Sequence, residues 1–341
     1  MRGAAPPRGL ACGAPTHEFW ARCSDEEYRT TDETFTYYRC RDCNVLFIDP
    51  VPRERLREIY PPNYYSFAEP GRSLVHRVKD RLDGRLFRGL LRGFPGPALR
   101  VLDIGGGAGR QLDLIKGLDC RVSFTQVVDL DPNATARAAA NGHAAFLGPV
   151  EDFQTSARFD LILLLNLIEH VFDPGAVLAK ARGLLAPGGV ILVKTPNCDS
   201  LDACLFRDHS WGGYHCPRHW VLFDRASFTG LAARNDLAVR EFRYTQGAPF
   251  WAQSVLFALA RARLVSITRD RPAMYHPLFP VLSAAFAALD WTRAFLGART
   301  SQMFFVLGGR SGAAATPSPN PLPRRRWRGQ GEGARPREAN P

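Results

Sequence analysis

A glycine-rich loop with acidic neighbours is the part of this 341-residue sequence best suited to chemistry. The stretch VLDIGGGAGR runs from apolar residues through Asp103 into the alternating glycines Gly105, Gly107 and Gly109. Glycines at this spacing let the backbone turn sharply and approach a ligand closely. A dinucleotide-binding loop needs its third glycine where this sequence has Arg110. Asp103 would also repel a pyrophosphate and attract an ammonium group, so the loop disfavours a dinucleotide.

A second carboxylate follows the next apolar stretch. In VVDLDP, Asp129 stands twenty residues after Gly109. A carboxylate at the tip of the second strand of a nucleotide-binding fold can accept hydrogen bonds from both ribose hydroxyls. Asp131 is a rival for this role, because it lies two residues later on the same face. The loop and this carboxylate together predict a nucleoside site.

Histidines in two later segments are candidates for moving a proton. In LNLIEHVFDP, Asn166, Glu169 and His170 follow an apolar stretch, and His170 is either a general base or a loop-capping residue. The segment DHSWGGYHCPRHWVLF contributes His215 and His219, which are one helical turn apart and could point the same way. We expect the general base to be among His215, His170 and His219, with His215 as first choice.

Two segments of the sequence contain candidate zinc ligands. The first fifty residues are rich in cysteine, and Cys40 and Cys43 form a C-x-x-C pair that can hold half of a tetrahedral site. Cys12 is the third candidate ligand, with either Cys23 or His17 as the fourth. A redox role is disfavoured, because a thioredoxin-like C-x-x-C should open a helix within a βαβ unit.

The alternative zinc site would use the later histidine segment. It would consist of His215, Cys216 and His219, but this segment lacks a companion pair of ligands.

Alternating apolar and helical stretches must position these residues. The strand-like stretches are 99–104, 122–129, 159–166 and 190–195, and the helical stretches lie near 109–117, 132–141 and 174–185. This alternation predicts βαβ units, and hence a parallel sheet with helices on both faces. A short strand at 303–307 would close the sheet, after a mostly apolar helical insert at 246–300.

The sequence from about 98 to 245, with the closing strand, resembles the class I S-adenosylmethionine (SAM) dependent methyltransferases. The resemblance rests on the glycine loop, Asp129, and the stretches 159–174 and 184–197. It implies an α/β fold with a doubly wound, mostly parallel, seven-stranded Rossmann-like sheet. A small N-terminal Cys-rich module and a helical insert before the last strand would be attached to it.

The same resemblance implies roles for individual residues. The three glycines would pass beneath SAM, Asp103 would stand near the methionine amino group and Asp129 would hold the ribose. Asp152 would cap the adenine N6 amine while Phe153 stacks beside it. Asn166, at the end of the fourth strand, completes the expected cofactor-binding set.

The resemblance is strongest to small-molecule methyltransferases with an E-H-V-x-D-P sequence, including those of quinone biosynthesis. Some of these hold a divalent metal with the E-H pair and a carboxylate three residues earlier, where this chain has Asn166, which argues against a metal there. Similar methyltransferases carry an H-x-x-x-H element over the acceptor pocket. Others have a zinc-ribbon-like head with two cysteine knuckles, and here Gly9 replaces the first cysteine of the first knuckle.

Composition and charge limit the partners. Hydrophobic residues make up 45% of the chain and charged residues 23%, which excludes a wholly disordered protein. Much of the net charge of +11 lies in residues 72–92 and 311–341, away from the candidate site. No basic stripe with interleaved aromatics crosses that site, so we expect no nucleic-acid partner.

Localisation follows from what the sequence lacks. It contains no apolar run long enough to span a bilayer and no signal-like apolar segment near its start. We therefore expect a cytoplasmic protein, with peripheral membrane contact left open.

We expect four parts in the chain: a zinc-ribbon-like module (1–50), a linker with a basic amphipathic helix (51–97), a methyltransferase domain (98–310) and a disordered basic tail (311–341). The expected function is SAM-dependent methyl transfer to a small molecule: a sugar, an envelope glycan or lipid precursor, a quinone or a secondary metabolite. The alternatives are a nicotinamide-dependent oxidoreductase and a module that binds SAM or a nucleotide without turnover.

Overall fold

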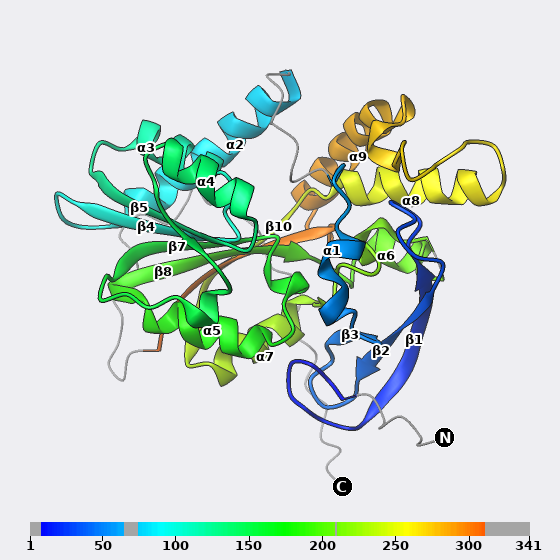
Figure 1. Cartoon of the computed structure of the whole chain (residues 1–341), viewed down its shortest axis with the longest axis horizontal. Coiled ribbons are helices and arrows are strands. Elements are labelled where there is room, and N and C mark those ends of the chain that lie inside the picture. The colour runs from blue at the N-terminus through cyan, green and yellow to red at the C-terminus, as the bar shows by residue number, and fades with distance from the viewer. Residues whose placement is uncertain (1–7, 65–73, 209, 311–341) are drawn as a thin grey trace, which may run out of the picture.

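A seven-stranded sheet forms the centre of the molecule (Figure 1). The computed structural model describes residues 8–64, 74–208 and 210–310, without the side chains of residues 74–79, so the predicted tail lies outside it. The strands are β4 (Leu99–Ile104), β5 (Val122–Asp129), β6 (Ala144–Leu147), β7 (Phe159–Leu165), β8 (Leu185–Pro196), β10 (Leu237–Thr245) and β11 (Gln302–Gly309).

The order of the strands is β10-β11-β8-β7-β4-β5-β6. Neighbours from β8 to β6 are parallel, and β11 runs antiparallel to both β8 and β10. The chain builds outward from β4 to β6 and then returns to β7 on the other side of β4. This reversal is the switch point at which open α/β sheets bind ligands. The predicted mostly parallel, doubly wound sheet is confirmed.

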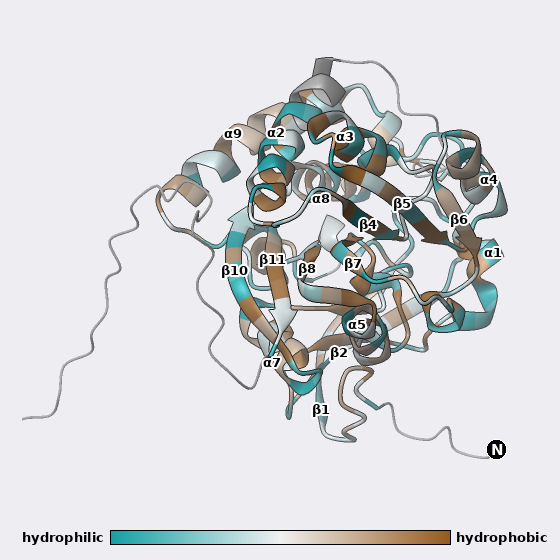
Figure 2. Ribbon diagram, turned by 90° about the vertical axis from the view of Figure 1, so that its left-hand side faces the viewer, coloured by the Kyte–Doolittle hydropathy of each residue, from teal (hydrophilic) through white to brown (hydrophobic). Residues whose placement is uncertain are grey.

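Helices cover both faces of this sheet, because its buried strands are apolar on both sides (Figure 2). Side chains of α2 (Leu74–Leu91), α3 (Arg110–Leu118) and α4 (Pro132–Ala140) share one core cluster with alternate strand residues. Those of α5 (Pro174–Gly183) and α7 (Arg225–Arg234) share the other cluster. Figure 1 shows these two layers above and below the strands.

A second, four-stranded sheet carries the N-terminal segment. Its strands are β1 (His17–Ser24), β2 (Thr34–Cys40), β3 (Leu46–Asp49) and β9 (Val221–Leu222), paired antiparallel in that order. Strand β9 comes from the segment after β8, so the N-terminal sheet and the segment with His215 and His219 are joined by backbone hydrogen bonds. We call residues 8–49 the head.

The short helices α1 (Leu56–Ile59) and α6 (Leu201–Leu205) lie in connections, and an apolar insert separates β10 from β11. The insert consists of α8 (Ala248–Arg261) and α9 (Leu278–Phe295), which pack against each other. Among the described residues, every helix is too short or too polar to cross a bilayer.

Candidate active site

The glycine loop leaves β4 at the switch point of the sheet. Ile104 pairs with Val128 of β5, and Asp103 pairs with Leu163 of β7, so the ends of three neighbouring strands lie level at this edge. Ligands of open α/β sheets bind at such an edge. The residues that follow these strands are therefore brought together as the sequence pattern predicted.

The loop needs glycine for two different reasons. Gly107 has a φ of +56°, and a Cβ there would meet nothing within 4 Å, so the loop borders open space at this point. At Gly106, a Cβ would lie 2.6 Å from Cγ of Asp103, which shows how closely the loop wraps around that carboxyl group.

Asp129 is tied to the same loop. Its carboxylate accepts hydrogen bonds from the backbone N–H of Gly107 (2.8 Å) and of Asp131 (2.9 Å). Asp131 itself caps α4, because its side chain accepts a hydrogen bond from the N–H of Asn133 (2.8 Å). Of the two acids considered for the ribose, Asp129 therefore faces the loop, and Asp131 has a local structural role.

Asp103 is buried without an ionic partner among the described residues. Burial, together with a smaller effect of the nearby charge of Asp129, raises the pKa of Asp103 to about 8. A buried acid with a raised pKa at a ligand-binding edge is typical of a functional site, where a cationic ligand would compensate the carboxylate.

The remaining residues of the expected cofactor set are arranged differently from one another. Asp152 is exposed at the end of a short 3-10 turn, whereas Phe153 is buried and packs against Phe146, with ring centroids 5.2 Å apart. Asn166 directly follows β7 and has a φ of +54°, and its side-chain oxygen accepts a hydrogen bond from Gln302 (3.0 Å).

Gly109 faces the protein interior rather than the loop's open side. A Cβ at this position would lie 2.4 Å from Cδ2 of His143.

Three histidines meet beside this edge. The ring centroid of His219 lies 4.6 Å from that of His170 and 5.0 Å from that of His215. His215 and His219 do not share a helix as their spacing suggested, because a short 3-10 turn (Gly212–Tyr214) ends at His215, which has a φ of +39°. Their rings still converge. The segment that carries Glu169 and His170 packs against the glycine loop. A Cβ at Gly105 would meet the side chain of Leu167, two residues before Glu169.

His215 is held between an acid and a phenol. Its Nδ1 lies 2.5 Å from a carboxylate oxygen of Glu27, and its Nε2 lies 3.1 Å from the hydroxyl of Tyr64. The Tyr60 hydroxyl lies 3.0 Å from Nδ1 of His170. Sequence reasoning missed Glu27, Tyr60 and Tyr64, and the aromatic run IYPPNYY before the basic helix was the only signal for the two tyrosines.

The other two histidines are kept neutral by their surroundings. Burial lowers the pKa of His170 to about 3, with the nearby His215 adding to the effect. Burial also lowers the pKa of His219 well below its usual range, and His170 lowers it further. Glu169, between them in the cluster, is fully buried, and burial raises its pKa to about 8. Neutral imidazoles beside a buried carboxyl can accept protons or bind a cation.

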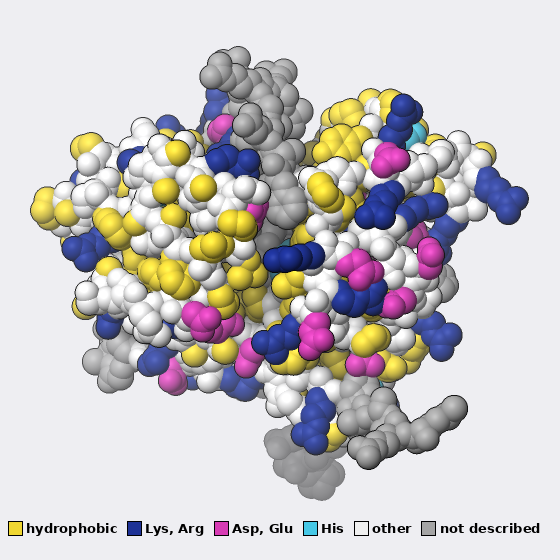
Figure 3. All heavy atoms as spheres, in the orientation of Figure 1, with side chains coloured by type: hydrophobic (Ala, Val, Ile, Leu, Met, Phe, Trp, Pro, Cys, Tyr) yellow, Lys and Arg dark blue, Asp and Glu magenta, His cyan; other side chains and the backbone are white. Residues whose placement is uncertain are grey.

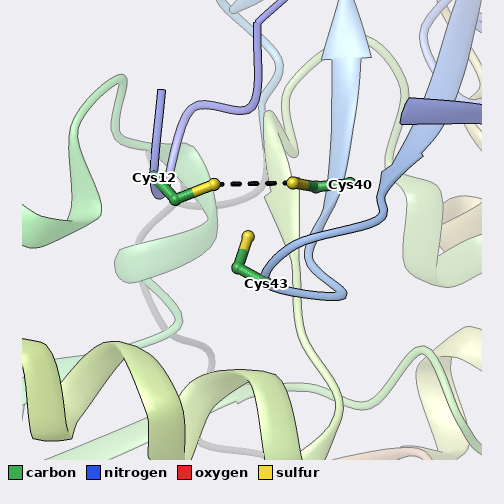
Figure 4. A group of neighbouring side chains, drawn as sticks. All are labelled: Cys12, Cys40 and Cys43. Atoms are coloured by element: carbon green, nitrogen blue, oxygen red, sulfur yellow. Dashed lines mark hydrogen bonds between the residues drawn. The ribbon is translucent and has the colours of Figure 1, made fainter. Parts of the chain in front are cut away.

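The head brings three of the predicted zinc ligands together (Figure 4). The sulfur atoms of Cys12 and Cys40 are 3.4 Å apart, and that of Cys43 lies within 4.8 Å of both. Although burial acts to raise the pKa of Cys40, the backbone N–H groups of Cys43 and Asp42 lower it below the usual value. Thiols gathered in this way fit a zinc ion.

Neither candidate for a fourth zinc ligand joins this cluster. Cys23 is buried in a separate core cluster on β1, and the ring of His17 packs against Tyr38 instead. Gly9 occupies the place where a fourth ligand would stand, because a Cβ at Gly9 would lie 3.3 Å from the sulfur of Cys40 and 3.4 Å from that of Cys12. The alternative zinc site of His215, Cys216 and His219 does not form a metal-binding group among the described residues.

Comparison with known proteins identifies the central domain. Residues 74–241 match a family described as a methyltransferase domain. The chain is 38% identical over 107 residues to a ubiquinone biosynthesis O-methyltransferase of Rhodopseudomonas palustris (strain HaA2), covering 29% of this chain and 40% of the relative. The protein of the same name from Nitrobacter winogradskyi is 39% identical over 107 residues, covering 29% and 39%. The chain thus spans about 40% of the length of these relatives.

Similar solved structures are more distant. Coclaurine N-methyltransferase has a TM-score of 0.44 at 14% identity, with 76% of this chain and 81% of that chain covered. A putative sarcosine dimethylglycine methyltransferase from Galdieria sulphuraria has a TM-score of 0.44 at 12% identity, with 69% and 86% covered.

Proposed function

We propose that the protein transfers a methyl group from SAM to a small-molecule acceptor, because residues 74–241 match a family described as a methyltransferase domain. One observation supports this above all: the glycine loop with Asp129 and the histidine cluster meet at the same edge of the sheet. The names of the relatives favour a hydroxyl group of a quinone-like molecule as the acceptor. Sugars, envelope precursors and secondary metabolites with a hydroxyl group are the other classes considered.

We propose that the loop edge holds SAM. Asp129 would accept hydrogen bonds from the ribose hydroxyls, and Asp103 would pair with the methionine ammonium group, which would offset the cost of burying its charge. Asn166, Asp152 and Phe153 are proposed to complete the site around the adenosine. When bound, SAM supplies a methyl group on a positively charged sulfur.

The acceptor must lose a proton as its oxygen takes the methyl group. We propose that His215 receives this proton, directly or through the hydroxyl of Tyr64. Glu27 would keep hydrogen on Nδ1 of His215, leave Nε2 to accept the proton and stabilise the imidazolium that forms. The acceptor oxygen, freed of its proton, would take the methyl group that SAM supplies.

Zinc is proposed for the head. Cys12, Cys40 and Cys43 would supply three thiolates, and the ion would tie the loop that carries Cys12 to the turn after β2. The chemistry is structural, since the cluster is in the head and not at the glycine loop.

Calorimetry with SAM tests the cofactor assignment. We expect the wild-type chain to bind SAM and Asp129→Ala to weaken binding about 10- to 100-fold, because a hydrogen bond to a charged group contributes about 1.5–3 kcal/mol. Asp131→Ala is the matched control: it should lower the free energy of unfolding by about 1 kcal/mol through loss of the helix cap and leave SAM binding intact. Equal SAM affinity in wild type and Asp129→Ala would refute the assignment.

Label transfer separates an enzyme from the alternatives. Incubation with methyl-labelled SAM and a cell extract should move label onto a small molecule. A module that only binds SAM would leave all label on the cofactor, and a nicotinamide-dependent oxidoreductase would bind the dinucleotide in place of SAM.

The apolar surface of α9 is proposed as a contact with anionic membranes. Val281, Phe295 and Leu296 are 65%, 67% and 75% exposed on or just after this helix, and Figure 3 shows hydrophobic side chains gathered over it at the upper right. The only acid within α9, Asp290, is buried, and Arg263, Arg269 and Arg271 lie exposed in the segment between α8 and α9. Apolar surface beside excess arginine suits an anionic lipid interface.

A further inference from the structure

A groove lies between α2 and α3, which pack side by side on one face of the central sheet (Figure 2). Its volume is about 370 Å³, within the range of about 300–1,000 Å³ that is usual for small-molecule sites. Helix α2 lines the groove with three arginines and Gly84, and α3 lines it with Leu114 and Leu118. The groove therefore combines positive charge with apolar surface.

The arginines of the groove are Arg81, Arg85 and Arg88, at positions i, i+4 and i+7 of α2, so they share one face of the helix. All three are exposed, and no ion pair or side-chain hydrogen bond holds any of them within the described part of the chain. Asp80, the acid of the groove, is already paired with Arg110 at 2.6 Å. Arginine binds phosphate oxygens through two parallel N–H groups, so three unpaired guanidinium groups around one hollow suit a phosphate.

Gly84 lines the groove although neither backbone conformation nor packing requires glycine there. It lies inside α2 without a positive φ, and a Cβ would meet only Leu118, at an ordinary contact distance of 3.7 Å. Glycine in the interior of a helix is less stable than alanine. Its missing side chain keeps the groove open, so a ligand accounts for a glycine that the fold does not need.

The lining favours an aliphatic ligand over a nucleotide or a bilayer. No aromatic side chain is among the described residues of the groove, whereas nucleic-acid bases are usually held by stacking on aromatic rings. A flat bilayer reaches protruding side chains, but here Leu114 and Leu118 lie within a hollow beside the arginines. A single molecule with an aliphatic chain and a phosphate group can use both parts of the lining.

The groove is separate from the cofactor edge. Helix α3 begins at Arg110, directly after the glycine loop, and Leu114 and Leu118 lie about one and two turns further along the helix. None of the residues proposed to hold SAM or to move a proton lines the groove.

We propose that the groove between α2 and α3 binds one free aliphatic phosphate, with the phosphate on the three arginines and the chain against Gly84 and the two leucines. The site is a second small-molecule site, distinct from the sites for SAM and the acceptor. It does not depend on the proposed methyl transfer, because it uses none of the same residues.

Calorimetric titration of the full chain with octyl phosphate, below its micelle concentration, tests the site. Inorganic phosphate serves as the head group alone, and octyl glucoside serves as an uncharged molecule with the same chain. We expect one octyl phosphate per chain, bound more than about tenfold tighter than inorganic phosphate, because burial of only two methylene groups is worth about that much. Octyl glucoside should bind more than about tenfold weaker than octyl phosphate, since it cannot form hydrogen bonds with a charged phosphate.

Two variants test the two parts of the lining. Arg85→Gln should weaken binding of octyl phosphate by about tenfold or more, whereas Arg92→Gln, exposed just after α2 and outside the groove, should leave it unchanged. Gly84→Leu should fill the groove and weaken binding of octyl phosphate more than about tenfold, while inorganic phosphate binds as in wild type. Because Arg85 is exposed and unpaired, its replacement keeps the test decisive even if Gly84→Leu does not fold.

Three results would overturn the proposal. The first is that octyl phosphate does not bind, or binds equally well to wild type, Arg85→Gln and folded Gly84→Leu. The second is displacement of octyl phosphate by saturating SAM, which would place the probe at the cofactor edge. The third is binding of phosphatidylglycerol vesicles that depends on Arg85 while octyl phosphate does not bind, which would assign the arginines to a membrane surface.

Discussion

Glu27 shows how one residue outside the central domain can control the proposed chemistry. Its two carboxylate oxygens contact Nδ1 of His215 and the side-chain N–H of Gln253 (2.9 Å). Glu27→Gln keeps the size of the side chain but removes the charge that stabilises an imidazolium. We expect label transfer from SAM to slow about 100-fold, within the about 10²–10⁴-fold range of general-base catalysis. Calorimetry should show unchanged SAM affinity, and an unchanged transfer rate would exclude His215 as the base.

Gly9 is the residue that decides the completeness of the proposed zinc site. Its Cβ direction points at the sulfurs of Cys12 and Cys40, so Gly9→Cys should complete a four-thiolate site. We expect zinc affinity, measured by competition with a chelator, to rise at least about 10- to 100-fold. Ala11→Cys adds a thiol in the same loop and should leave the affinity near that of wild type. Equal affinities for Gly9→Cys and wild type would show that position 9 does not face the ion.

At the scale of elements, regular periodicity made the central fold predictable. The apolar runs at 99–104 and 122–129 match β4 and β5, since strands buried on both faces along most of their length carry mainly apolar residues. β8 begins earlier than predicted, at Leu185, because it already pairs with Phe159 there before the Gly188 turn. The glycine loop could also be predicted, because its glycines and Asp103 are neighbours in the sequence.

The acceptor side was less predictable for a physical reason. His215 depends on Glu27, 188 residues away, and on Tyr64, 151 residues away. Contacts of such range arise from how the head packs on the central sheet and leave no periodic pattern. The sequence therefore indicated three histidines whose rings converge in the structure, but it could not assign their partners.

We expect the exposed apolar face of α9 to bind anionic vesicles. Replacing Val281 and Phe295 together by serine should reduce recovery of the protein with phosphatidylglycerol vesicles about tenfold or more, because each large apolar side chain contributes about 1.5–3 kcal/mol when fully transferred from water. Flotation measures the recovery, and vesicles of phosphatidylcholine alone should bind less. Phe19→Ser, at another exposed aromatic on β1, is the control. If the protein does not bind vesicles and light scattering instead shows a dimer formed through this face, the proposed membrane contact is contradicted.

On the scale of the whole molecule, the head is built into the central domain. Arg218 and Asp25, both buried, form a two-fold hydrogen-bonded ion pair at 2.9 and 3.1 Å between the head and the histidine segment. Burial alone would raise the pKa of Asp25, but the charge and hydrogen bonds of Arg218 lower it below its usual value. The hydroxyl of Tyr37 also donates to the carbonyl of His219 (2.6 Å). The head thus positions the histidine segment of the proposed acceptor site as well as carrying the cysteine cluster.

Asp103 makes one contribution to the dependence of folding stability on pH. Its pKa is about 8 in the folded chain and about 3.9 when unfolded, so the folded state binds an extra proton between these values. The contribution of Asp103 to stability without SAM should therefore fall as pH rises from about 4 to about 8, by at most about 1.4 kcal/mol per pH unit. The lowered folded pKa of Asp25 stabilises the fold above about pH 4, and acid removes this contribution at lower pH.

Asp103→Asn isolates this effect, because the amide keeps the shape and cannot ionise. Urea unfolding at pH 5, 6, 7 and 8 should give a free energy of unfolding that falls less steeply in the variant than in wild type, with the largest gain for the variant near pH 8. Other buried acids contribute equally to both proteins and cancel in the comparison. Saturating SAM should restore the wild-type protein at pH 8 but not stabilise the variant to the same extent, since the ammonium group would lose its counter-charge. If the free energy of unfolding depends on pH in the same way in both proteins, the pKa of Asp103 is not raised by folding, and the site is not built to compensate a cation.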